Sequence, residues 1–210
     1  HLLSRRQRQM CIRDSMYPFV THTWNAIKGI CFHDCPYCYM KKFDGLLPVR
    51  IDPKELKVNL GNGNFIFVGS GTDAWAFDIP SDWITCFLDY CNLFNNNYLF
   101  QSKDPSRFLK FISHPVMQKS VLWTTIETNV FYPNIVRNAP NTRKRAKAMQ
   151  KLASLGMRTY VTCEPLIKFD LPEMVELIKM CSPVQVNIGK NSRQDLSLIH
   201  ISEPTRLDVI

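Results

Sequence analysis

Three cysteines fall within eight residues of the sequence, in the segment CFHDCPYC. The spacings of Cys31, Cys35 and Cys38 are four and three residues, so one short loop can carry all three thiols. Three thiolates can ligate three irons of a cubane iron–sulfur cluster and leave the fourth iron open to bind a substrate or a cofactor. A single zinc ion held by these thiolates and by His22 or His33 is the alternative, although no second cysteine knuckle accompanies the loop.

Six runs rich in β-branched and aromatic residues predict the strands that must position this loop. They cover residues 22–27, 64–70, 97–103, 121–128, 158–164 and 184–189. Helical patterns between them begin with typical start signals at Asp52-Pro53, Ser81-Asp82, Asp104-Pro105, Asn141-Thr142 and Asp170-Leu171-Pro172. The strands repeat about every 32 residues, the size of one βαβ step. This α/β alternation predicts parallel strands in a partial (β/α)6 TIM-like barrel, or else an open doubly wound sheet.

Polar residues gather at the carboxyl ends of five of these strands, where both architectures place their chemistry. Two of these strands carry a carboxylate within the strand, Glu127 in TTIETN and Glu164 in TCEP. An ionised carboxylate is costly in an apolar core, so we expect both to line a polar cavity. Lys103, after the third strand, is either a partner for a carboxylate or a substrate anion, or a solvated lysine at the strand end.

The motif Cys-x-x-x-Cys-x-aromatic-Cys after the first strand of a six-fold β/α chain resembles the radical S-adenosylmethionine superfamily. The resemblance spans residues 16–193 and implies a 4Fe-4S cluster on Cys31, Cys35 and Cys38, with S-adenosylmethionine on the open iron. In this superfamily an electron from the cluster cleaves the sulfonium and yields a 5′-deoxyadenosyl radical, which abstracts hydrogen from a substrate. A reductant such as flavodoxin or ferredoxin is implied as a partner.

The resemblance also assigns cofactor-binding residues. Tyr37 matches the aromatic position near the adenine, and Gly69-Ser70-Gly71 resembles the turn that meets the methionine amino group. The acidic residue usual at that turn is absent, and we expect Asp73 to substitute for it. The fourth strand occupies the place of the polar contacts to ribose or methionine, and alternation puts three candidates on one face, namely Thr125, Glu127 and Asn129.

Three residues are candidates for catalysis: Glu164, Lys103 and Cys163. The thiol of Cys163 is either a hydrogen donor to a substrate radical or a buried structural group, because free cysteines are often buried. Alternation places this thiol on the face opposite Glu164.

Other segments narrow the resemblance without identifying a substrate. The segments TWN, FQSKDPSRF, TIETN and CEPL look similar to a phage- and bacteria-associated radical S-adenosylmethionine family whose substrate is not established. The YCY element resembles spore photoproduct lyase, a DNA repair enzyme, over the cluster loop alone. A DNA or RNA repair or modifying lyase is therefore the alternative within the class. A zinc-stabilised, non-catalytic nucleic-acid-binding module is the alternative outside it.

Composition and charge limit the class of protein further. The 210 residues include 26 Lys and Arg against 18 Asp and Glu, for a net charge of +8. No apolar run reaches the roughly 18 residues of a membrane span, and the sparse cysteines do not form a disulfide scaffold. We therefore expect a cytoplasmic protein with no membrane partner. Nucleic acid is a less favoured partner, because the basic helix after Asn141 lacks interleaved aromatic residues for base stacking.

The two ends of the chain carry no strand or helix pattern. Residues 1–15 and 194–210 resemble translated sequencing-adapter sequence, so we expect both to be non-native tails around a C-terminally truncated core of residues 16–193. On this interpretation the sixth helix is missing and the outer edge of the last strand is uncovered.

Overall fold

The computed structural model describes residues 17–189 and 205–208. Six strands of its main sheet are parallel and stand in chain order across the sheet. These are His22–Trp24 (β1), Phe65–Val68 (β4), Asn97–Gln101 (β5), Ser120–Thr125 (β6), Arg158–Cys163 (β7) and Gln185–Ile188 (β8). The predicted α/β fold, a partial TIM-like barrel of parallel strands, is confirmed.

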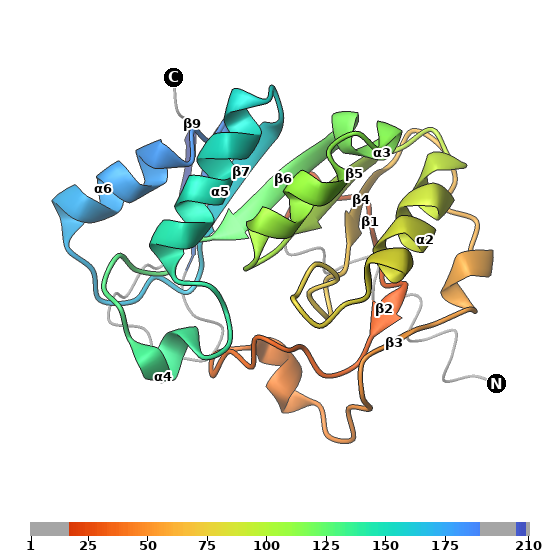
Figure 1. Ribbon diagram of the computed structural model, residues 1–210, viewed down its shortest axis with the longest axis horizontal. Helices are drawn as coiled ribbons and strands as arrows, with labels where there is room; N and C mark the ends of the chain where they lie inside the picture. Colours follow the sequence, from red (N-terminus) through yellow and green to blue (C-terminus); the bar gives the residue numbers. More distant parts are fainter. Residues whose placement is uncertain (1–16, 190–204, 209–210) are drawn as a thin grey trace.

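The longer helices cover one face of this sheet, as Figure 1 shows. They are Ser81–Asn92 (α2), Thr142–Ser154 (α5) and Leu171–Met180 (α6), and each begins at a predicted start signal. Two of these signals act as caps, since Asn141 accepts a hydrogen bond from the Lys144 amide at 2.9 Å and Asp170 from the Glu173 amide at 3.0 Å. Two four-residue helices, Pro115–Gln118 (α3) and Pro133–Val136 (α4), complete the set of α-helices in the described residues.

Two predicted helices are 3-10 helices instead, Glu55–Lys57 (η2) and Pro105–Phe111 (η3). At the second, the Asp104 side chain bonds Ser106 Oγ, and the backbone closes i→i+3 bonds such as Arg107 N to Asp104 O at 3.1 Å. A further 3-10 helix, Tyr39–Lys42 (η1), follows the cysteine loop. The start signals in the sequence thus predicted helical turns at these positions, but they did not distinguish α-helices from 3-10 helices.

The first predicted strand also ends earlier than expected, at Trp24. Ile27–Lys28 (β2) leaves the main sheet and pairs antiparallel with Arg50–Ile51 (β3). The break falls at Asn25, whose side chain bonds the turn after β4 instead of continuing the strand.

The sheet has a different core on each face. Between the sheet and the helices, Trp75 packs edge-on against Phe87, Phe100 and Phe108. Inside the barrel, Tyr17 and Phe67 pack with Trp123, with ring centroids of Tyr17 and Trp123 4.3 Å apart. Aromatic side chains therefore fill the interior beneath the strand ends that carry polar residues.

The last parallel strand is not an open edge. Thr205–Asp208 (β9) pairs antiparallel with β8, so the expectation of an uncovered edge there is wrong. The predicted tail of residues 1–15 lies outside the described residues, as does the remainder of 194–210. Within the described ranges, every helix is too short or too polar to cross a lipid bilayer.

Candidate active site

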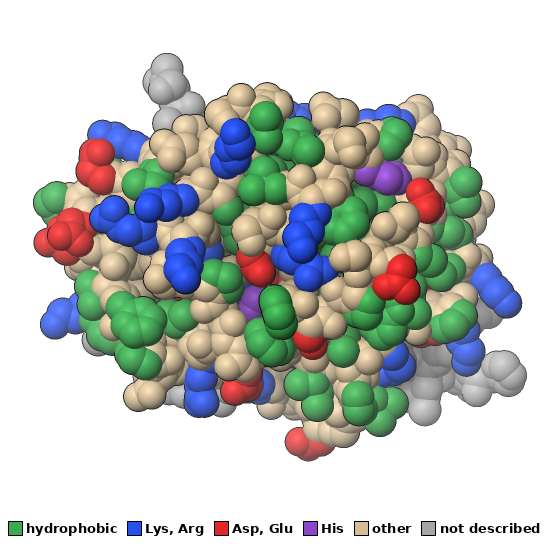
Figure 2. All heavy atoms as spheres, viewed as in Figure 1, with side chains coloured by type: hydrophobic (Ala, Val, Ile, Leu, Met, Phe, Trp, Pro, Cys, Tyr) green, Lys and Arg blue, Asp and Glu red, His purple; other side chains and the backbone are tan. Residues whose placement is uncertain are grey.

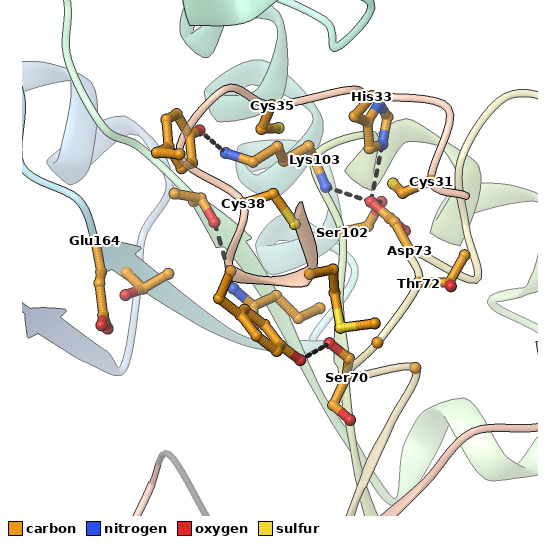
Figure 3. A pocket seen from close by; sticks show the side chains of 18 of the residues that line it. Cys31, His33, Cys35, Cys38, Ser70, Thr72, Asp73, Ser102, Lys103 and Glu164 are labelled. Carbon is orange, nitrogen blue, oxygen red and sulfur yellow. Dashed lines mark hydrogen bonds and ion pairs between the residues drawn. The ribbon is translucent and has the colours of Figure 1, made fainter. Parts of the chain in front are cut away.

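A cavity of about 440 Å³ lies at the carboxyl ends of β4 to β7, inside the barrel. The cysteine loop, which follows β2, forms one wall, and the turns after the strands of the main sheet form the others (Figure 3). The three cysteines of the motif all line this cavity, and none of them forms a disulfide. Eight other sequence-predicted residues line it with them: Tyr37, Gly69, Ser70, Gly71, Asp73, Lys103, Thr125 and Glu164.

The three thiols suit the ligands of a cubane cluster. In the described residues, no three His, Cys, Asp or Glu side chains converge on one metal position. A zinc site needs such convergence, whereas each thiolate of a cubane binds a different iron. His33, the predicted zinc ligand of the loop, instead bonds Asp73 through Nε2 at 2.8 Å. The donor set of three free thiols on one loop therefore fits a 4Fe-4S cluster.

Burial of the loop raises the pKa of the Cys31 thiol to about 12 and also raises that of Cys35. A thiol must lose its proton to become a ligand, so metal binding here must release protons. The positive charges of Lys103 and Arg145 act in the opposite direction on Cys35 and offset part of this rise in its pKa.

Asp73 ties the cysteine loop to the strand ends. Its carboxylate accepts hydrogen bonds from His33 Nε2 at 2.8 Å, Ser102 Oγ at 2.9 Å and the Lys103 amide at 2.9 Å, and Oδ1 accepts from the Trp75 amide at 3.0 Å. Burial alone would raise the pKa of Asp73, but His33 and these donors hold it below its usual value. Asp73 thus lines the cavity as predicted, yet its oxygens already have partners within the protein.

The glycine-rich turn is held by Asn25, a residue that the sequence analysis did not single out. Asn25 Oδ1 accepts from the Gly71 amide at 3.1 Å and from Ser70 Oγ at 3.3 Å. Gly69 has a φ of +83°, and a Cβ there would lie 3.1 Å from the Thr72 carbonyl oxygen. Tyr39 donates to the Ser70 carbonyl at 2.7 Å, which joins this turn to the cysteine loop. The sequence pattern placed Asn25 inside the predicted strand of residues 22–27, so its position directly after β1 was visible only in the structure.

Glu127 does not face the cavity, in contrast to the prediction. It is 0% exposed, and its carboxylate accepts from Arg145 Nη1 at 2.7 Å, the Tyr37 hydroxyl at 2.9 Å and Lys103 Nζ at 3.3 Å. Burial alone would raise its pKa, but Arg145 and Lys103 lower it to about 2. Tyr37, matched to the adenine position, therefore also anchors the loop to Glu127 behind the cavity.

Glu164 is the opposite case, because it faces the cavity and no cation among the described residues compensates its carboxylate. No hydrogen bond or ion pair joins its carboxylate to another side chain in the described part of the chain, and burial raises its pKa. Gly189 lies against it, and a Cβ at that position would be 2.9 Å from Glu164 Cδ. The absence of a side chain at Gly189 therefore leaves room for this carboxylate.

Two predicted site residues lie away from the cavity. Asn129 donates to Glu173 Oε2 at 2.9 Å and accepts from the Asp170 amide at 2.9 Å, so it fixes the start of α6. Cys163 is 1% exposed in the core between sheet and helices, where burial raises its thiol pKa to about 12. The positions of Asn129 and Cys163 are typical of structural residues. A thiol that donates hydrogen to a substrate radical would have to face the cavity.

No protein-family model matches the sequence, and no curated protein matches it. Among solved structures, a cysteine variant of spore photoproduct lyase matches with a TM-score of 0.61 and 14% identity, over 79% of this chain and 54% of the lyase. A variant with bound AdoMet and dinucleoside spore photoproduct gives 0.61 and 13% over the same shares. The lyase complexed with dinucleoside spore photoproduct gives 0.58 and 14%, over 74% of this chain and 48% of that one.

These likenesses show the fold. The chain shares the fold of the spore photoproduct lyase structures, and it spans about half the length of the lyase structures that it matches.

Proposed function

We propose that this chain is a radical S-adenosylmethionine enzyme, in which Cys31, Cys35 and Cys38 hold a 4Fe-4S cluster. One observation carries the proposal: three free thiols of a single loop line the same cavity at the carboxyl ends of parallel strands. The fold likeness to spore photoproduct lyase, including a structure with bound AdoMet, supports it.

The chain's own residues would bind and shield S-adenosylmethionine in this cavity. A bound cluster would supply an open iron and one electron. The backbone of the Gly69 to Gly71 turn, fixed by Asn25, presents polar groups to the cofactor. The carboxylate of Glu164 is available to a cationic group or to hydroxyl donors of the ligand. Tyr17 and Phe67 form an apolar floor that excludes water, which protects a reactive intermediate.

A nucleic-acid lyase is the second candidate function. It is supported by the lyase structures with dinucleoside spore photoproduct and by the net charge of +8. Phosphate contacts make binding salt-dependent, so oligonucleotide affinity measured against salt concentration tests this candidate. A salt-insensitive or absent interaction would argue against it.

Detection of 5′-deoxyadenosine tests the proposal. Anaerobically reconstituted protein, given dithionite and S-adenosylmethionine, should form 5′-deoxyadenosine, and Cys35→Ala should not. Cys86→Ala is the matched control, because this half-buried thiol lies on α2 and does not line the cavity. Equal product from Cys35→Ala and the wild-type protein would refute the proposed function.

A further inference from the structure

A second cavity, of about 490 Å³, lies on the outer side of the cysteine loop. Its walls include Phe32 and His33 of that loop, Phe77 of the loop after β4, and Lys144 in the first turn of α5. His33 lines both cavities and lies between Cys31 and Cys35 in the sequence. The outer cavity thus gives access to the cysteine loop from the protein surface without passing through the inner one.

Hydrogen bonds from side chains to backbone carbonyls hold the walls of the outer cavity in place. Asn138 Nδ2 donates to the Phe32 carbonyl at 2.8 Å, which fixes the cysteine loop against the segment before α5. The buried Arg107 donates to the carbonyls of Phe77 at 3.1 Å and Ile79 at 2.6 Å. The Phe32 and Phe77 rings, with centroids 6.0 Å apart, lie side by side at the cavity.

The surface around this cavity combines an exposed apolar residue with positive charge. Phe77 is 72% exposed. Arg143, Lys144 and Lys147 are exposed on the first two turns of α5, and Lys and Arg side chains gather over this helix in Figure 2. We call Phe32, Phe77 and these three basic residues the outer surface.

One further feature adds to the positive potential of the outer surface, because the amino end of α5 carries a partial positive charge. Arg145 also lines the cavity, but its charge is compensated by Glu127 at 2.7 Å. The acidic groups nearby are Asp104, which is buried and bonded to Ser106, Asp78 beside Phe77, and Asp34 beside His33, which pairs with Lys41 and Arg137. An apolar centre with a charged rim is typical of small, transient protein interfaces.

We infer that the outer surface docks an acidic electron-transfer protein, which delivers an electron to the cluster through the loop segment around His33. The inference rests on the proposed function, since only a cluster on this loop requires an electron. One electron leaves the reduced cofactor of the donor and reaches the cluster on Cys31, Cys35 and Cys38, and no atom or proton is transferred. The inner cavity is reserved for S-adenosylmethionine and substrate, so the donor approaches from the opposite side of the loop.

The test compares a protein donor with a small-molecule reductant. Reconstituted full chain is mixed anaerobically with reduced flavodoxin or with dithionite, and the loss of cluster absorbance is followed in time. Lys144→Glu and Phe77→Ala should each slow reduction by flavodoxin on the order of tenfold at low salt and leave reduction by dithionite unchanged. The matched control is Lys119→Glu, an exposed lysine before β6 at the amino ends of the strands, which should change neither rate.

The outcomes separate this inference from the proposed function. Equal flavodoxin rates for Lys144→Glu, Phe77→Ala and the control would overturn the docking surface alone. Slower reduction by dithionite as well would also overturn it, because the substitutions would then act on the cluster site. Loss of oligonucleotide binding in Lys144→Glu with an unchanged flavodoxin rate would assign the surface to nucleic acid instead. A wild-type chain that assembles no cluster would overturn both the proposed function and the docking surface.

Discussion

Glu127 and Glu164 follow neighbouring strands of the same sheet, yet their surroundings are opposite. Glu127 is enclosed behind the cysteine loop and bonded to Arg145, Tyr37 and Lys103. Glu164 lies on the cavity side and has no side-chain partner in the described residues. Their pKa values accordingly shift in opposite directions, to about 2 for Glu127 and upward for Glu164.

This contrast shows what separates a structural carboxylate from a ligand-binding one at a strand end. A buried carboxylate is stable when cations from other elements compensate it, and α5 supplies Arg145 to Glu127. Within the described residues no element supplies a cation to Glu164, and we propose that its charge is available to a ligand. We therefore propose different roles for three carboxylates: Glu127 holds the cysteine loop, Asp73 joins this loop to the strand ends, and Glu164 is available to a ligand.

Removal of the Glu127 side chain should cause the largest loss in the free energy of unfolding. Glu127→Ala leaves the buried Arg145 guanidinium without its partner, and breaking a buried pair in this way costs about 3–5 kcal/mol of unfolding free energy. Glu164→Ala removes no partner and should cost less than about 1 kcal/mol. Urea unfolding of both variants measures the difference. Similar losses for the two variants would contradict the division of roles.

Gly189→Ala should weaken ligand binding through Glu164. The added Cβ would lie 2.9 Å from Glu164 Cδ, so the carboxylate must move. We expect the affinity for S-adenosylmethionine to fall about tenfold, or about 1.4 kcal/mol, as measured by calorimetry on the reconstituted protein. The double variant Gly189→Ala/Glu164→Gln serves as the control and should lose no more than Glu164→Gln alone. Additive losses would show that Gly189 acts independently of Glu164.

The two carboxylates should also impose opposite pH dependences on stability. The folded-state pKa of Glu127 is about 2 against a usual 4.5, so its stabilising contribution is present above pH 4.5 and is lost as pH falls toward 2. The pKa of Glu164 is raised by burial, so its contribution is present below pH 4.5 and is lost as pH rises through the raised pKa. Unfolding free energies against pH should show that Glu127→Gln removes the acid-side loss, and that Glu164→Gln removes the loss above pH 4.5. If Glu127→Gln instead removed the loss above pH 4.5 and Glu164→Gln removed the acid-side loss, the pKa directions assigned to the two carboxylates would be wrong.

Tyr37→Phe should cause the smallest change among these predictions, a small loss in the free energy of unfolding. It removes one hydroxyl donor to Glu127 while Arg145 and Lys103 remain, so we expect a loss of about 1 kcal/mol in unfolding free energy. Tyr132→Phe is a suitable control, since Tyr132 packs in the same cluster with Cys35 and Tyr37 and its hydroxyl makes no hydrogen bond to any described residue. A null result for Tyr37→Phe would show that the hydroxyl does not anchor the loop.

The sequence was sufficient to predict the strands, the cysteine loop and the polar strand ends, because these features depend on local patterns. The caps Asn141 and Asp170 are examples, since each acts on an amide three residues away. The partner of Glu127 was missed because the pairing depends on how α5 packs against the sheet. One signal was available: Arg145 lies four residues before Met149 and so shares the buried side of the helix.

The local sequence pattern could not predict the role of Asp73 either. Its position two residues after Gly71 is consistent with a cofactor contact, and only the folded chain brings His33 and Ser102 to its carboxylate. Likewise, alternation placed Glu127 on the same face as Thr125, but the strand ends at Thr125 and the chain then turns away from the cavity.

Metal analysis of anaerobically purified protein tests the central claim most directly. If Cys31, Cys35 and Cys38 hold a cubane cluster, the reconstituted protein should be brown and contain about four irons per chain. Cys35→Ala should lose this iron, and Cys86→Ala should retain it. A colourless protein that binds one zinc ion per chain through the same cysteines would contradict the account.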